Sequence, residues 1–112
     1  MQASTPALFQ GNASSTAVFE ALRQALEGIG PCQIEEKKTS LHIKGPRAAF
    51  LGVHPRRNGI RVNIVLPEAL QSPRVVKAEQ VSANRWHNEI DLLSPTDVDD
   101  ELTAWIQQAH AR

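Results

Sequence analysis

The fold is decided by the stretch IRVNIVL, residues 60–66, which is the clearest strand signal in the chain. Every second side chain in it is apolar, and the polar residues Arg61 and Asn63 lie between them. A period of two residues is typical of a strand that has one buried face and one solvated face. We therefore expect a sheet that is dry on one side and polar on the other.

Four further segments carry strand signals on either side of this stretch. They alternate or are apolar throughout, and turn-forming residues separate them. The expected strands cover residues 33–38, 41–44, 48–53 and 89–93. Residues 55–59 are expected to form a hairpin connection in which Asn58 and Gly59 supply positive φ. All connections but one are short, so the sheet should be mainly antiparallel, with about five strands.

Two segments repeat their apolar residues at the helical spacing of three and four. The first helix is expected over 16–27, with Ser15 or Thr16 as its N-cap. The second is expected over 95–109, with Ser94 as N-cap and Asp97 completing an acidic capping box. Both helices can cover the dry face of the sheet, which predicts an α+β fold.

The remaining segments lack a clear period. Residues 68–85 contain Pro73 and many polar residues, so a loop is expected there. Residues 1–15 are rich in Ala, Ser and Thr and are expected to form a flexible N-terminal arm. A chain of 112 residues suits one domain, which we place at 16–112.

Composition narrows the classes of function. Twelve basic and twelve acidic side chains cancel, which argues against a dedicated nucleic-acid binder. Cys32 is the only cysteine, so no intramolecular disulfide can form, and a small buried side chain is its simplest interpretation. Residues 1–15 do not resemble a signal peptide, and no apolar run approaches the roughly 20 residues that span a bilayer. We expect a cytoplasmic protein without a membrane segment.

Several chemistries lack the residue pattern that they require. The four histidines are scattered and show no metal-ligand spacing, so neither a metal nor a cofactor is expected. No glycine cluster precedes a helix, and no serine lies in a nucleophile elbow. Glu35-Glu36-Lys37 resembles a fragment of a nuclease motif, but the first aspartate of the chain, Asp91, comes too late to be its partner. No catalytic residues are assigned.

The polar face of the expected sheet is the remaining candidate. By alternation it carries a mixture of charged and polar side chains: Glu35, Lys37, His42, Lys44, Arg61, Asn63, Glu89 and Asp91. This face is interpreted as a solvated surface with cross-strand charge pairs, as a binding surface, or as a subunit interface. Trp86 is the only plausible side chain on which a nucleic-acid base could stack. The candidate ligand-binding residues are Lys37, His42, Arg61 and His87.

Three hypotheses of function follow. In the first, the chain is a non-enzymatic binding or accessory module whose sheet face engages a ligand, a protein or a nucleic acid. In the second, it is a small hydrolase-like enzyme that uses His87 as general base beside Asp91 or Glu89. In the third, it forms a homodimer through the sheet face or an edge strand.

Several short motifs together resemble a widespread bacterial domain of unknown function. The resemblance rests on residues 37–43, 50–55, 59–62 and 87–92, and continues through Ser94, 97–99 and 109–110. It covers the chain from Val18 to the C-terminus. The sequence departs from the family pattern at Leu41 and His110, where aromatic side chains are expected.

This resemblance implies a domain that is sometimes labelled a predicted transport protein. It occurs alone or at the C-terminus of proteins similar to restriction systems, which implies a role in binding nucleic acid or a protein partner. Six residues fall at positions that the family pattern favours: Lys37, Lys38, Pro55, Arg61, His87 and Asp99. The family carries no established activity, so no reaction follows from the resemblance.

Overall fold

The computed structural model describes residues 6–112, which form six strands, two α-helices and two short 3₁₀ helices. The α-helices are α1 (Ala13–Glu27) and α2 (Asp100–Ala111), and the 3₁₀ helices are η1 (Ala7–Phe9) and η2 (Pro95–Asp97). The strands are β1 (Gln33–Glu36), β2 (Leu41–Lys44), β3 (Ala49–Arg56), β4 (Gly59–Leu66), β5 (Val75–Ser82) and β6 (Arg85–Leu92). The predicted α+β class is confirmed.

The strands form one antiparallel sheet in the order β1-β2-β3-β4-β6-β5. The sheet has six strands rather than about five, because β5 lies within residues 68–85, where a loop was expected. β5 is an edge strand and is exposed at almost every position, so its sequence carries no alternation of apolar and polar residues. Its pairing with β6 through the backbone is what defines it as a strand.

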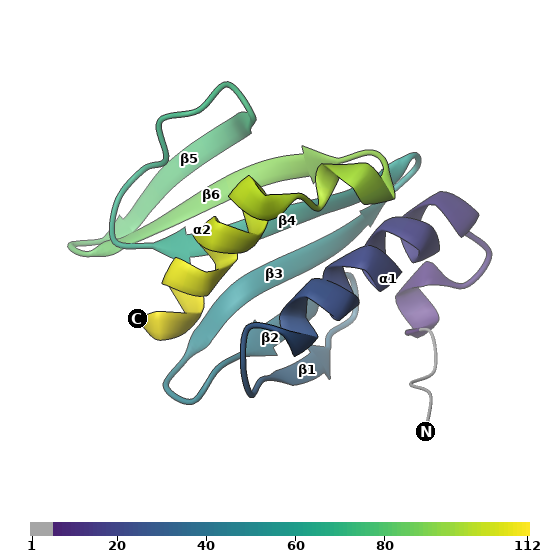
Figure 1. Cartoon of the computed structure of the whole chain (residues 1–112), viewed down its shortest axis with the longest axis horizontal. Coiled ribbons are helices and arrows are strands. Elements are labelled where there is room, and N and C mark those ends of the chain that lie inside the picture. Colours follow the sequence, from purple (N-terminus) through teal and green to yellow (C-terminus); the bar gives the residue numbers. More distant parts are fainter. Residues whose placement is uncertain (1–5) are drawn as a thin grey trace.

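Both α-helices lie on the same face of the sheet (Figure 1). Their apolar stripes pack on the inward side chains of the strands, and α1 and α2 both contact β4. β4 therefore lies at the centre of the core. Within residues 6–112, neither helix is long and apolar enough to cross a membrane.

α1 begins at Ala13 rather than at Thr16. Its N-cap is Asn12, whose Oδ1 accepts a hydrogen bond from the backbone N–H of Ser15 at 3.0 Å. Ser15 is buried inside the helix, and its hydroxyl lies 2.8 Å from the carbonyl oxygen of Arg56 and 2.6 Å from that of Gly59. The prediction of Ser15 or Thr16 as cap is wrong because Ser15 instead ties α1 to the β3–β4 turn.

The segment before α1 packs against the domain over the part that the structure describes. The side chain of Phe9 in η1 is fully buried, and its ring centroid lies 4.8 Å from that of Phe19 in α1. The expected arm therefore does not extend over residues 6–15, where the buried phenylalanine contributes to the core. Residues 1–5 of that expected arm lie outside the described residues.

The second predicted helix is interrupted. Asp97 ends η2, and its carboxylate accepts hydrogen bonds from the backbone N–H groups of Leu93 at 2.8 Å and Ser94 at 3.2 Å, which is the acidic half of the expected capping box. Asp99 then caps α2 by accepting from the N–H of Leu102 at 3.0 Å. Two capping aspartates in succession divide one predicted helix into two.

The β3–β4 hairpin turns through Arg57 and Asn58. Of the two residues expected to have positive φ, only Gly59 does so, at +158°. Gly59 pairs with Arg56 at the end of the hairpin and approaches the carbonyl oxygen of Leu92 so closely that a Cβ would lie 2.0 Å from it. This close approach, rather than the turn alone, requires glycine.

A hollow on the outer face of the sheet

The face of the sheet that the helices do not cover has a gap at its centre. The strand register places His42 of β2, Gly52 of β3, Asn63 of β4 and Glu89 of β6 in one row across this outer face. A Cβ at Gly52 would make only an ordinary contact, at 3.5 Å from the Cβ of Asn63. The missing side chain at Gly52 therefore leaves open space between its neighbours.

This space is a cavity of about 110 Å³, which we call the outer hollow. It is lined by His42, Ala49, Leu51, Gly52, Asn63, Val65, Arg85 and His87.

Three buried polar atoms of these lining residues have no hydrogen-bond partner within residues 6–112: Asn63 Oδ1, Arg85 Nε and His87 Nε2. No other side-chain nitrogen or oxygen in the described part of the chain is buried without a partner. Leaving one buried polar group unpaired costs about 1–3 kcal/mol, so unpaired groups are rare and require an explanation. All three residues line the outer hollow, and this points to a polar ligand there.

The charge of the outer hollow comes from Arg85. Among the described residues, Arg85 takes part in no ion pair. Burial lowers the pKa of His87, and the nearby Arg85 guanidinium lowers it further. The His87 ring is thereby neutral near pH 7, and it offers a hydrogen bond rather than a second charge.

A second, wider hollow of about 320 Å³ adjoins the first and shares Asn63 and His87 with it. Its other lining residues are His54, Arg56, Arg61 and Glu89. Arg61 donates to the two carboxylate oxygens of Asp91 at 2.7 and 2.9 Å and lies 3.6 Å from Glu89. The charge of Arg61 is therefore already neutralised by Asp91 and Glu89. The charge of Arg85, which has no ion-pair partner among the described residues, makes the outer hollow the better candidate for binding an anion.

The structure does not bring the four predicted ligand-binding residues together at one site. His42 and His87 line the outer hollow together, and Arg61 lies in the adjoining one. Lys37 follows β1, forms an ion pair with Glu35 at 2.5 Å, and lines neither hollow.

Sequence reasoning missed three features of the outer hollow. Arg85 lies in a segment that was expected to be a loop. Gly52 has no side chain that could indicate a binding site, and Asn63 was placed on the polar face but not among the candidate ligand-binding residues. Trp86, the proposed base-stacking residue, pairs with Leu66 and lies on the helix-covered face by alternation with His87. If the predicted strand had begun at Arg85 rather than at Glu89, its alternation would have placed Arg85 on the outer face with His87.

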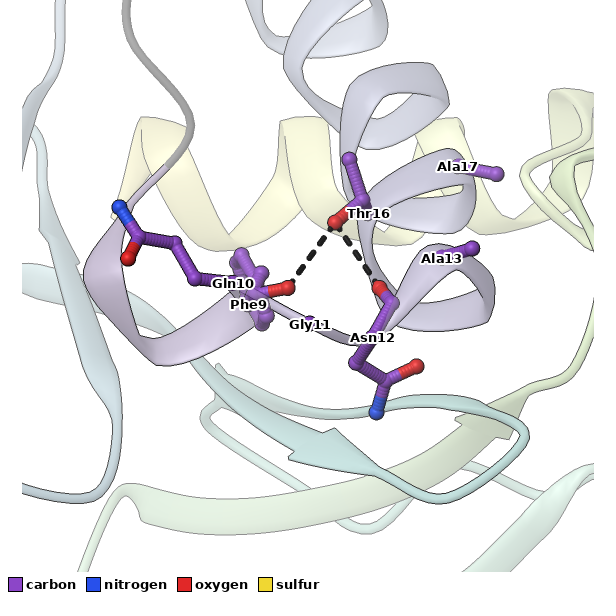
Figure 2. A pocket seen from close by; sticks show the side chains of 7 residues that line it. All are labelled: Phe9, Gln10, Gly11, Asn12, Ala13, Thr16 and Ala17. Atoms are coloured by element: carbon purple, nitrogen blue, oxygen red, sulfur yellow. Dashed lines mark hydrogen bonds between the residues drawn. The ribbon is translucent and has the colours of Figure 1, made fainter.

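A third hollow lies at the N-terminus of α1 and is lined by residues of η1 and the first turns of α1 (Figure 2). Its polar groups contact one another: the Thr16 hydroxyl lies 2.9 Å from the carbonyl oxygen of Asn12 and 3.2 Å from that of Phe9. The Asn12 amide nitrogen donates to the carbonyl oxygen of Arg56 at 2.9 Å. Within residues 6–112, no residue that lines this hollow carries a buried side-chain polar atom without a partner, so it lacks the feature that marks the outer hollow.

The outer hollow offers little for covalent catalysis. No hydroxyl, thiol or carboxylate side chain is among the residues that line it. Within residues 6–112, no three His, Cys, Asp or Glu side chains gather closely enough to hold a metal ion. Asp91, one proposed partner of a His87 general base, is instead held by Arg61.

The Arg61–Asp91 pair makes stability depend on pH. The Arg61 hydrogen bond lowers the pKa of Asp91, and the Leu102 backbone N–H lowers that of Asp99. A carboxyl whose pKa is lower in the folded state stabilises the fold above its unfolded pKa, and this stability is lost as the pH falls. We expect the free energy of unfolding to fall below about pH 5, and to fall less steeply in Asp91→Asn, in urea titrations across the acid range. Equal slopes for the two proteins would contradict this.

Comparison with known proteins identifies a family for this chain. No curated protein and no solved structure matches the chain significantly. The model of one family matches residues 6–111, from η1 to the end of α2, and so covers every element of the sheet and both helices. This match confirms the part of the resemblance that concerned a domain of unknown function. The chain belongs to the family described as a domain of unknown function, DUF5655.

Proposed function

We propose that this domain is a non-enzymatic binding module that takes a small hydroxylated anion into the outer hollow. The observation that carries the proposal is that Asn63, Arg85 and His87, which each carry a buried polar atom without a partner within residues 6–112, all line one cavity. A ligand that pairs with them removes a desolvation cost that the unbound protein bears.

The chemistry of the three atoms selects the ligand class. The Nε–H of Arg85 is a charged donor and suits a carboxylate or phosphate oxygen. Asn63 Oδ1 is an acceptor, so the same ligand must also offer a donor such as a hydroxyl. His87 Nε2 can fill either role, because a neutral imidazole donates from one nitrogen and accepts at the other.

The size of the cavity limits the ligand. A volume of about 110 Å³ corresponds to roughly three or four water molecules at about 30 Å³ each. A phosphate group or a short hydroxy acid fits this space, and the adjoining hollow leaves room for a substituent. A non-enzymatic role is favoured because the lining of the outer hollow includes no hydroxyl or thiol side chain for His87 to activate and no carboxylate to orient His87.

Removing the charged donor should weaken binding without unfolding the protein. We expect Arg85→Gln to raise the dissociation constant about 10- to 100-fold, because a hydrogen bond to a charged group contributes about 1.5–3 kcal/mol. The probes are inorganic phosphate, lactate and tartrate, titrated while the side-chain NMR signals of Asn63 and His87, which every variant retains, are followed. Arg57→Gln, an exposed arginine on the β3–β4 turn, is the matched control and should bind as the wild type does.

The outcomes separate the hypotheses. Saturable shifts confined to the two hollows support the proposal, whereas weak shifts spread over all basic side chains would overturn it. An oligonucleotide included as a fourth probe tests the nucleic-acid alternative. If the oligonucleotide binds more tightly than the small anions, and if Arg57→Gln weakens its binding as much as Arg85→Gln does, then the ligand is a nucleic-acid backbone and not a small anion.

Filling the hollow gives a test that does not alter charge. Gly52→Val places a branched side chain in the cavity, where the first added carbon makes only ordinary contacts. We expect probe binding to be lost while thermal stability is kept or increased, because valine suits a strand better than glycine. Unchanged binding in a folded Gly52→Val protein would show that the ligand lies elsewhere.

A further inference from the structure

The edge strand β5 is unusually open for a strand of eight residues. All of its positions except Val75 are exposed, and its only neighbour in the sheet is β6. The side chains of Val76 and Val81 are 51% and 46% exposed, which is high for large apolar residues. An unpaired strand edge presents free backbone N–H and C=O groups to which another strand can pair.

The charges on β5 are arranged so that they complement a second copy of the same strand. Lys77 and Glu79 lie two residues apart, on the outer face, opposite Glu89 and His87 of β6. Neither takes part in an ion pair within residues 6–112. Ala78 separates them, so a two-fold axis through Ala78 places Lys77 of each copy directly opposite Glu79 of the other.

The alternatives to this register are unfavourable. A two-fold axis perpendicular to the sheet keeps each side chain on its own face, so the register can shift only in steps of two residues. A shift in one direction places Lys77 opposite Lys77, and a shift in the other places Glu79 opposite Glu79. Like charges directly opposite one another destabilise a strand pair, whereas opposite charges stabilise it by a few tenths of a kcal/mol or more.

We propose that two copies of this chain pair through β5, antiparallel and centred on Ala78, to form one continuous twelve-stranded sheet. The register irregularities between Val75 and Lys77 and between Gln80 and Ser82 bound the paired segment at both ends. This inference uses a different surface from the outer hollow and does not rest on the proposed ligand.

Charge reversal tests the register. In Lys77→Glu and in Glu79→Lys every cross-strand pair becomes a pair of like charges, so each variant alone should show a dimer dissociation constant raised at least tenfold. The double swap Lys77→Glu/Glu79→Lys restores opposite charges and should restore dimerisation. An equimolar mixture of the two single variants should form a heterodimer, because each then presents the charges that the other lacks.

The measurement is sedimentation equilibrium of the full chain over concentrations up to the millimolar range, with circular dichroism to verify folding. Lys38→Glu, a charge reversal at an exposed position in the turn before β2, is the matched control and should dimerise as the wild type does. A wild-type chain that stays monomeric at millimolar concentration overturns the proposal. Dimers that persist in both single variants, or that the double swap fails to restore, overturn it equally.

Discussion

Gly59→Ala is expected to destabilise the protein by about 3–5 kcal/mol, a large share of the stability of a small domain. The added methyl carbon would lie 2.0 Å from the carbonyl oxygen of Leu92 and 3.0 Å from the Cα of Leu93. Both are backbone atoms, so they cannot move aside as the end of a flexible side chain can. The strain is added to the cost of a φ of +158°, which residues with a Cβ rarely adopt.

The cost is high because Gly59 lies where three strands meet. It follows the β3–β4 turn as the first residue of β4, and the next residue, Ile60, pairs with Leu92 of β6. Relief of the clash requires β4 and β6 to separate, and these strands carry the centre of the core. Ser15 of α1 also contacts the carbonyl oxygen of Gly59, so a shift there is transmitted to the helix.

Urea denaturation of Gly59→Ala measures this effect, and Gly28→Ala is its matched control. Gly28 has ordinary right-handed helical dihedral angles, and a Cβ there would make only a contact of 3.6 Å with the carbonyl oxygen of Ala25. We expect the control to be neutral or to gain about 0.5 kcal/mol, because alanine restricts the unfolded chain. Equal stabilities of the two variants would show that the approach of Leu92 is not tight in solution.

Asn88→Leu is expected to cost about 3–4 kcal/mol, because it removes the hydrogen bonds that hold the segment between β4 and β5. Asn88 is fully buried on the helix-covered face. Its Oδ1 accepts from the N–H of Leu70 at 2.9 Å, and its Nδ2 donates to the carbonyl oxygens of Glu68 at 3.3 Å and Ile64 at 3.4 Å. Leucine is of similar size, so the loss comes from backbone groups left without a partner.

Thermal and urea unfolding of Asn88→Leu should be compared with Gln108→Leu. Gln108 is an exposed amide on α2, so the control makes the same chemical change without disturbing a buried bond. We expect the control to stay within about 0.5 kcal/mol of the wild type. A loss below 1 kcal/mol in Asn88→Leu would mean that the segment satisfies its backbone groups by other means.

Local periodicity predicted the elements that have one buried face. Residues 60–64 of β4 alternate because helices cover one side of the strand and not the other, and α1 and α2 show the matching helical stripes. β5 has no such asymmetry because both of its faces are exposed, so residues 75–82 show no alternation of apolar and polar side chains. The start of each helix was misplaced by a few residues because Asn12, Ser15, Asp97 and Asp99 can all act as N-terminal caps, and only the tertiary contacts of Ser15 exclude it.

The candidate site was only partly predictable for a related reason. Alternation placed His42, Arg61 and Asn63 on the outer face, because a strand period needs no knowledge of neighbouring strands. The hollow itself depends on the pairing of β3 between β2 and β4, which sets Gly52 among larger side chains. Whether a polar atom of Asn63 or Arg85 is buried without a partner is a property of that assembly, and no local pattern encodes it.

The strand order has a consequence for the dynamics of the sheet. β5 lies at the edge of the sheet, outside β6, although β6 follows it in the sequence. It contributes no residue to the outer hollow. Opening of β5 therefore leaves β1, β2, β3, β4 and β6 paired and the cavity intact. In the monomer, amide hydrogen exchange should be faster in the edge strand β5 than in the central strand β4, so that β5 opens and closes as a separate unit while the outer hollow stays formed.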